Sequence, residues 1–128
     1  MIDENKLLYA ESHEWANVEG DVCTIGTTRF AAEQLTDIVF VDLPKPGKQI
    51  KVGEVFGQIE TVKAVSDLYA PLAGEIIDVN SAAANDPAMM TGDPYGKGWL
   101  IKIKLSGTPD TSKLMSKGDY DSKASAAH

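Results

Sequence analysis

The chain has little cysteine, little positive charge and no long apolar run. Its single cysteine, Cys23, cannot form an internal disulfide, which excludes the disulfide-stapled class of small secreted domains. No stretch approaches the roughly 20 apolar residues that a membrane-spanning helix needs. Twelve basic residues stand against 19 acidic ones, a net charge of -7. We therefore expect neither a nucleic-acid partner nor a membrane partner, and we expect docking onto proteins with basic rims.

Metal ligands and catalytic groups are also scarce. His13 and His128 lie far apart in the sequence, and with one cysteine they offer no metal-ligand spacing. No pairing of a nucleophile with a base is visible, so we expect neither a metal site nor an enzyme. Cys23 lies in an apolar run and is expected to be a small buried hydrophobe. The segment Met1–Asn5 is acidic where a targeting peptide would be basic, so we expect the chain to remain where it is made.

The composition is that of one globular domain. Hydrophobic residues make up 43% of the 128 and charged residues 24%. At this length, folding removes roughly two-thirds of the unfolded chain's surface from water. We expect a single domain over 1–128, with its core at about 7–105. A helical segment is expected at 106–120, with its helix at 111–120, and a flexible tail at 121–128.

Short β-rich segments separated by turn formers predict a mostly β fold. Helical spacing after candidate caps predicts a helix at 27–35, and Ser81 is expected to cap one helical turn. Strands are expected at 9–11, 15–18, 22–25, 38–43, 49–52, 55–62, 65–69, 74–79 and 99–105.

One lysine, Lys63, is expected at the tip of a β-hairpin. If the loop consists of Lys63 and Ala64, Glu60 lies directly opposite Asp67. Like charges across a ladder destabilise by up to about 1 kcal/mol. This pair of carboxylates, which we call the acidic collar below Lys63, is then better explained by recognition than by stability.

Four blocks of the sequence resemble the glycine cleavage system H proteins. They lie at 12–15, 34–44, 60–75 and 93–103, and the third contains Glu-Thr-Val-Lys-Ala followed by Ser-Asp. The blocks occur in the order and spacing of that family. The sequence departs from the family's usual residues at Arg29 and Phe30, and its C-terminal tail is more polar.

The resemblance implies a fold, a cofactor and a set of partners. The fold is a small lipoyl/biotinyl-type β-sandwich, or barrel-sandwich hybrid, with short flanking helices. Lys63 would carry covalently attached lipoic acid. The chain would be a monomeric carrier that moves the aminomethyl group of glycine from the pyridoxal-phosphate glycine decarboxylase to the tetrahydrofolate-dependent aminomethyltransferase. Dihydrolipoamide dehydrogenase would reoxidise it, and a lipoyl ligase or octanoyltransferase would modify it. Its location would be the bacterial cytoplasm, or the mitochondrial matrix for a processed chain.

The resemblance also implies roles for three carboxylates. Glu14 and Asp67 would protect the cationic aminomethyl group on the body of the protein, and Glu60 and Asp67 would take part in recognition. Two other functions are kept open. One is a lipoyl donor or relay protein that serves other lipoyl-dependent enzymes. The other is a biotin carrier, although biotin carriers place methionines beside the lysine where this sequence has Val62 and Ala64.

Overall fold

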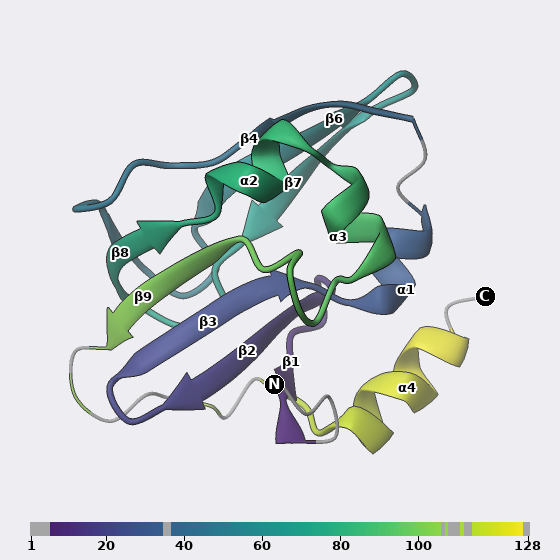
Figure 1. Cartoon of the computed structure of the whole chain (residues 1–128). Coiled ribbons are helices and arrows are strands. Elements are labelled where there is room, and N and C mark those ends of the chain that lie inside the picture. Colours follow the sequence, from purple (N-terminus) through teal and green to yellow (C-terminus); the bar gives the residue numbers. More distant parts are fainter. Residues whose placement is uncertain (1–5, 35–36, 106, 108–110, 112–113, 127–128) are drawn as a thin grey trace.

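The structure, a computed structural model, describes residues 6–34, 37–105, 107, 111 and 114–126. These residues contain nine short strands and four helices. The strands are β1 (Leu8–Tyr9), β2 (Glu14–Glu19), β3 (Val22–Thr27), β4 (Ile38–Asp42), β5 (Gln49–Ile50), β6 (Val55–Thr61), β7 (Val65–Tyr69), β8 (Gly74–Val79) and β9 (Ile101–Leu105). The helices are α1 (Arg29–Gln34), α2 (Ser81–Asn85), α3 (Ala88–Gly92) and α4 (Lys117–Ala126). The mostly β fold with short helices is confirmed (Figure 1).

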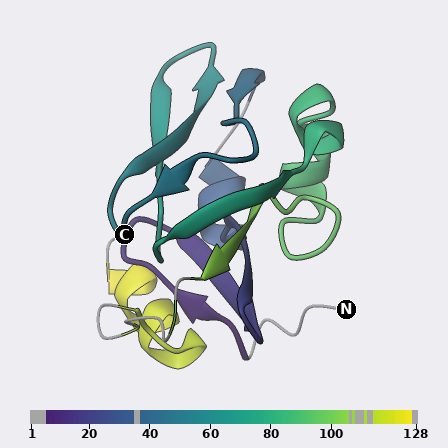
Figure 2. The same cartoon turned by 90° about the vertical axis from the view of Figure 1, so that its left-hand side faces the viewer.

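Two antiparallel sheets enclose the core. The larger sheet has the order β1-β2-β3-β9-β8-β5, and the smaller one has the order β4-β6-β7. Figure 2 shows the hairpin of β6 and β7 rising away from β1 to β3. Buried side chains from both sheets meet in one cluster, among them Ile25 and Ile103 from the larger sheet and Ile59 and Leu68 from the smaller. The expected sandwich is therefore present, and it leaves the hairpin tip outside the core.

Strand β9 shows how alternation selects the core face. Ile101, Ile103 and Leu105 are buried, whereas Lys104 between them is exposed. Successive side chains of a strand point to opposite faces, so an apolar-basic alternation buries one face and solvates the other. The expected closing strand is confirmed, and it begins at Ile101 rather than at residue 99.

Local caps position the short helices. The hydroxyl of Thr28 accepts a hydrogen bond from the Ala31 amide at 3.2 Å, which satisfies one of the free amides at the start of α1. Helix α2 forms where expected, but its cap is Asn80 and not Ser81. The Asn80 side-chain oxygen accepts from the Ala83 amide at 3.3 Å.

The last helix differs from the expectation of a helix at 111–120 followed by a tail. Helix α4 begins at Lys117 and continues to Ala126. Before it, Met115 pairs with Tyr9 through two backbone hydrogen bonds of 2.8 and 2.7 Å, and this extended pairing is incompatible with a helix there. Tyr120 is buried and stacks on Tyr9 with ring centroids 4.9 Å apart. Residues 106, 108–110, 112–113 and 127–128 of the expected segments lie outside the described residues.

Candidate functional site

Lys63 lies in the middle of the turn at residues 62–64, which joins β6 to β7. The last cross-strand pair before the turn is Glu60 opposite Val65, so the expectation of a two-residue loop is wrong. The hydroxyl of Thr61 accepts hydrogen bonds from the amides of Lys63 (3.3 Å) and Ala64 (3.2 Å). A threonine that bonds amides two and three residues ahead is a local alternative to ladder pairing. This signal was available in the sequence and was missed.

The turn is held firmly while the lysine remains exposed. The Thr61 amide donates to the Ala64 carbonyl at 2.8 Å, and the Val62 amide donates to the Asp37 carbonyl at 3.2 Å. The second bond ties the tip to the start of β4. The side chains of Val62 and Lys63 are exposed. Figure 1 shows the tip projecting beyond the helices at the upper right. The structure thus presents an amine on an ordered, projecting support.

The expected pairing of Glu60 with Asp67 does not occur. Gln58 lies opposite Asp67, and its amide donates to the Asp67 carboxylate at 2.8 Å. Glu60 lies opposite Val65 on one side and Phe40 on the other. Because the observed register is shifted by two residues, each side chain keeps its expected face. Glu60 and Asp67 are therefore diagonal neighbours, roughly 7 to 8 Å apart at their Cα atoms, and the like-charge collar is not formed.

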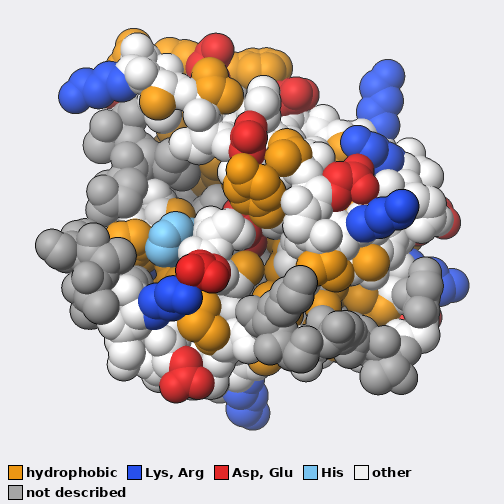
Figure 3. Space-filling view, turned by 180° about the vertical axis from the view of Figure 1, so that it is seen from behind, with side chains coloured by type: hydrophobic (Ala, Val, Ile, Leu, Met, Phe, Trp, Pro, Cys, Tyr) orange, Lys and Arg blue, Asp and Glu red, His pale blue; other side chains and the backbone are white. Residues whose placement is uncertain are grey.

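The outer face of the smaller sheet combines carboxylates with exposed apolar groups. We call it the acidic-apolar face, and it consists of two adjacent rows, Asp42-Gln58-Asp67 and Phe40-Glu60-Val65. Phe40 is 58% exposed and Val65 is 54% exposed. Seen from behind, the upper part of the molecule carries apolar side chains beside acidic ones (Figure 3). Large exposed apolar side chains grouped beside charges are typical of interaction surfaces.

Glu14 is almost fully buried, with 1% of its surface exposed. One carboxylate oxygen accepts a hydrogen bond from the Ser12 hydroxyl, and the other accepts from the Tyr69 amide at 3.2 Å. Burial raises the pKa of Glu14 to about 7, against the lowering effect of these two hydrogen bonds, because a low-dielectric surrounding disfavours the charged form. Glu14 is therefore not an ordinary exposed strand carboxylate.

The structure places Glu14 at the edge of the smaller sheet, far from the hairpin turn that carries Lys63. Its partner Tyr69 ends β7, four residues from Val65 at the other end of the strand, a length of about 13 Å. Asp67 lies on the same strand, but its carboxylate accepts a hydrogen bond from Gln58 on the outer face of the sheet. The two carboxylates expected to act together thus both lie at β7. Glu14 is buried against the end of this strand, and Asp67 is exposed on its outer face.

A buried polar cluster supports the segment that carries Glu14. His13 has a φ of 73°, and its Nδ1 lies 2.6 Å from the Tyr120 hydroxyl. That hydroxyl also lies 2.7 Å from the Thr28 hydroxyl. Burial raises the pKa of Tyr120 to about 12 and lowers that of His13. The positive φ of His13 is typical of a turn residue. The parts that Tyr120 and Ser12 play were not foreseen.

Other site classes receive no support from the residues that the structure describes. Within them, no group of three or more His, Cys, Asp or Glu side chains could hold a metal ion. No described helix is long and apolar enough to cross a membrane. Burial raises the pKa of the Cys23 thiol to about 12, as expected of a small buried hydrophobe.

Comparison with known proteins assigns the family. The family model for "Glycine cleavage H-protein" matches residues 7–127. The chain belongs to this family. It is 49% identical to the glycine cleavage system H protein of Acaryochloris marina, with 93% of both chains covered. It is 52% identical to that of Gloeobacter violaceus, with 82% of this chain and 81% of the relative covered.

A solved H-protein structure agrees with the fold. The crystal structure of a glycine cleavage system H protein from Mycobacterium marinum matches with a TM-score of 0.85 at 37% identity, and the match covers 94% of this chain and 98% of that one. Membership of the H-protein family, a lipoyl-carrier family, confirms the resemblance seen in the sequence blocks. The family assignment also sets the biotin-carrier alternative aside.

Proposed function

We propose that this chain is the lipoyl-bearing carrier of the glycine cleavage system, with lipoic acid attached through an amide to Lys63. The observation that carries the proposal is the position of Lys63 in an H-protein family member, exposed on a turn that the Thr61 hydroxyl and the Asp37 carbonyl hold. Among the described residues, no hydrogen bond or ion pair engages its ammonium group. A modifying enzyme needs an accessible amine on a rigid support, and this tip fits that need.

The attached group would supply a dithiolane that takes up the aminomethyl unit of glycine at the decarboxylase, yields it to the tetrahydrofolate-dependent aminomethyltransferase and is reoxidised by dihydrolipoamide dehydrogenase. The chain's own residues present, orient and shelter that arm. The bacterial origin of its relatives supports a bacterial cytoplasmic location.

Glu14 and Asp67 are proposed to hold the cationic end of the arm. A carboxylate can accept about four hydrogen bonds, and Glu14 receives one from Ser12 and one from Tyr69. The ammonium group at the end of the arm, if the arm lay along β7, would donate the remaining hydrogen bonds that the Glu14 carboxylate can accept. Among the residues that the structure describes, no cationic group acts on Glu14. An ammonium group paired with the ionised carboxylate in these buried surroundings would be held more strongly than in water. The exposed Asp67 would contribute attraction rather than enclosure.

The acidic-apolar face is proposed as the surface that partners recognise. Glu60 and Asp67 lie on it beside Phe40 and Val65, close to the turn that carries Lys63. A lipoyl ligase or octanoyltransferase, and the enzymes of glycine cleavage, would meet it with basic and apolar groups. Charge complementarity at such a face raises association rates, and a central aromatic residue supplies binding energy.

The attachment is tested by incubating the chain with lipoate and a lipoyl ligase, followed by intact-mass measurement and peptide mapping. We expect one lipoyl group on Lys63 and none on the Lys63→Ala variant. Lys51→Ala is the matched control, because it removes another exposed lysine and should be modified normally. Since Lys63 is exposed, its substitution should change the free energy of unfolding by no more than about 0.5 kcal/mol. Modification of the Lys63→Ala variant would contradict the proposal.

The relay alternative predicts a different property. A lipoyl donor for other enzymes has no need of a buried carboxylate beside β7, so the burial of Glu14 favours aminomethyl handling. Incubation of the modified chain with labelled glycine and the decarboxylase distinguishes the two. We expect label on the chain, whereas a relay would transfer its lipoyl group and take up no label.

A further inference from the structure

The turn that leads into Glu14 has a backbone conformation that few residues adopt. His13 has a φ of 73°, in the left-handed region that favours glycine and, to a lesser degree, asparagine, aspartate and histidine. Its amide donates to the Ala10 carbonyl at 3.0 Å, and its carbonyl accepts from the Thr28 amide at 3.1 Å. Ser12 and Glu14 lie on either side of it, and the Ser12 hydroxyl donates to the Glu14 carboxylate. The conformation of His13 therefore determines where this carboxylate is directed.

Such a conformation persists only where the surroundings hold it. The Nδ1 atom of His13 lies 2.6 Å from the Tyr120 hydroxyl, which lies 2.7 Å from the Thr28 hydroxyl. The Thr28 hydroxyl in turn accepts from the Ala31 amide at 3.2 Å. Thr28 and Tyr120 are both buried. Thr28 directly precedes α1 and Tyr120 belongs to α4, so two helices that are far apart in the sequence hold the side chain of one turn residue.

The direction of these hydrogen bonds follows from counting donors. The buried Thr28 hydroxyl already accepts from an amide, so its own proton goes to the Tyr120 oxygen. The Tyr120 proton is then donated to Nδ1 of His13. The opposite direction leaves the Thr28 proton without an acceptor in the part of the chain that the structure describes. His13 is therefore neutral in this arrangement and carries its proton on Nε2.

Helix α4 depends on the same tyrosine for its attachment. In residues 117–123, the part of α4 whose exposure is described, Tyr120 alone is buried. Its ring stacks on Tyr9 of β1 with the centroids 4.9 Å apart, and Figure 1 shows α4 lying beside this strand. Lys123 also pairs with Glu11 at 2.9 Å, but this pair is exposed, and exposed pairs contribute little. Tyr120 thus joins the C-terminal helix both to β1 and to the turn.

We propose that Tyr120, together with Thr28, is a positioning residue for Glu14. Acting through His13, its hydroxyl holds the turn that directs the Glu14 carboxylate toward the aminomethyl ammonium. This inference rests on the proposed role of Glu14. A binding group is effective only when neighbouring hydrogen bonds lock its geometry, and the C-terminal helix supplies one of those bonds.

The test measures how fast the aminomethyl group is lost. The lipoylated parent and its Tyr120→Phe variant are loaded with labelled glycine by the decarboxylase, and formaldehyde release is followed without the aminomethyltransferase. The variant keeps the ring that stacks on Tyr9 and lacks only the hydroxyl. We expect normal lipoylation and release that is roughly two- to tenfold faster than in the parent. Thr28→Val removes the other hydroxyl and should have an effect in the same direction if Tyr120→Phe does not fold.

Two readouts separate positioning from a general loss of stability. In a Glu14→Gln background, Tyr120→Phe should not speed release further, because the group that it positions is already gone. A purely structural effect would speed release equally in both backgrounds. Nitrogen-15 spectra provide the second readout. In the parent, His13 should carry its proton on Nε2, whereas in Tyr120→Phe both tautomers should be populated.

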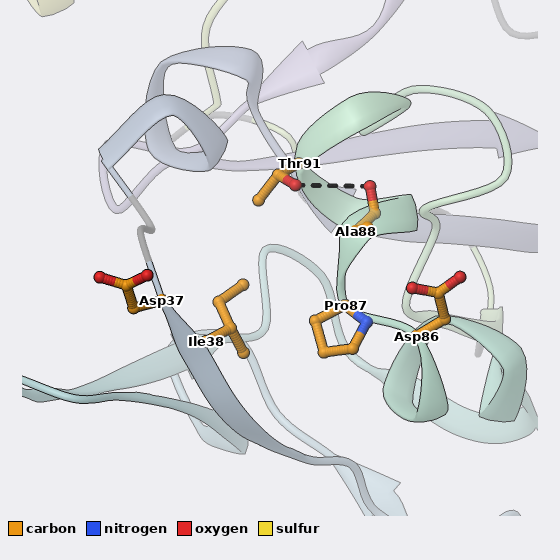
Figure 4. A pocket seen from close by; sticks show the side chains of 6 residues that line it. All are labelled: Asp37, Ile38, Asp86, Pro87, Ala88 and Thr91. Atoms are coloured by element: carbon orange, nitrogen blue, oxygen red, sulfur yellow. Dashed lines mark hydrogen bonds between the residues drawn. The ribbon is translucent and has the colours of Figure 1, made fainter.

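Two control variants should release formaldehyde at the parent's rate. Lys123→Met removes the ion pair between α4 and Glu11 and leaves the Tyr120 hydroxyl in place. Thr91→Val is the matched control for Thr28→Val. It removes a threonine hydroxyl that donates to the Ala88 carbonyl at 3.4 Å, in the lining of an open pocket between the start of β4 and α3 (Figure 4). No residue of that lining is a hydrogen-bond partner of the His13 or Glu14 side chain among the described residues.

Failure of the inference and failure of the proposed function give different results. Release at the parent's rate from Glu14→Gln would refute the role of Glu14, and the positioning role with it. Faster release from Glu14→Gln combined with the parent's rate from Tyr120→Phe would overturn only the positioning role. An effect of Tyr120→Phe that persists in the Glu14→Gln background, or an equal effect of Lys123→Met, would overturn it as well.

Discussion

Glu14→Gln should stabilise the protein at alkaline pH and leave acid stability nearly unchanged. The pKa of Glu14 rises from its ordinary value of 4.5 to about 7 on folding. The folded state therefore holds a proton that the unfolded state has lost between these values. The stability contributed by the protonated form is fully present below pH 4.5 and is lost as the pH rises through about 7.

The size of the effect follows from proton linkage. Each pKa unit corresponds to about 1.4 kcal/mol, so the raised pKa removes about 2.5 kcal/mol of unfolding free energy between pH 5 and pH 8. Glutamine has no such proton. Its side-chain oxygen can accept from the Tyr69 amide and its nitrogen can donate to the Ser12 hydroxyl, so both hydrogen bonds that Glu14 makes are kept.

Urea unfolding of the parent and the variant at pH 5, 6, 7 and 8 measures this difference. The gap in unfolding free energy should widen in favour of Glu14→Gln by up to about 2.5 kcal/mol across the series. Glu75→Gln, which alters an exposed strand carboxylate, should show no such widening. A constant gap for Glu14→Gln would refute the argument that its carboxylate is held in a low-dielectric site.

The same substitution should impair function while improving stability. If ionised Glu14 holds the aminomethyl ammonium, its loss removes a charge-assisted hydrogen bond that contributes about 1.5 to 3 kcal/mol. Formaldehyde release in the absence of the aminomethyltransferase should then be roughly ten- to hundred-fold faster. Lipoylation should be normal because the turn is untouched. Release at the parent's rate would leave Glu14 without a role in protection.

Three further predictions concern other parts of the molecule. Thr61→Val removes the hydroxyl that binds the amides of the turn and should cost about 1 kcal/mol in urea unfolding, with slower lipoylation as the second readout; unchanged rates would show that the turn needs no such bond. Tyr120→Phe removes the hydroxyl that bonds both Thr28 and His13, so that the buried Thr28 hydroxyl keeps only its bond from the Ala31 amide. This variant should cost about 1 to 3 kcal/mol, and an equally stable variant would contradict the importance of this cluster. Cys23, whose pKa burial raises to about 12, should react with a maleimide at pH 7 only in denaturant, so rapid labelling of the native chain would contradict its burial.

The sequence alone determined the features that depend on local pattern and on motif. The alternation in Ile101–Leu105 predicts a half-buried strand, because side chains on opposite faces of a strand meet different surroundings. Thr28 precedes a helical segment and caps it, since its side chain bonds an amide three residues ahead. Blocks around Glu14, Asp37, Lys63 and Tyr95 occur in an order and spacing that indicated the H-protein family.

Only the tertiary structure decided the register of the hairpin. A shift of two residues leaves every side chain on the same face, so the apolar pattern fits both the expected and the observed pairing. The hydroxyl of Thr61 and the bond from Val62 to Asp37 favour the longer turn. Asp37 directly precedes β4, which is far from the hairpin turn in the sequence, so local alternation alone could not distinguish the two registers.

The burial of Glu14 and the position of α4 were likewise decided by packing. Glu14 is bonded by Tyr69, which is 55 residues away in the sequence, and nothing near Glu14 in the chain signals that a second strand will cover it. Helix α4 has Tyr120 as its buried anchor, stacked on Tyr9 at the other end of the chain. Propensity favoured an earlier helix, but the pairing of Met115 with Tyr9 holds that segment extended. Long-range contacts outweigh weak local preferences.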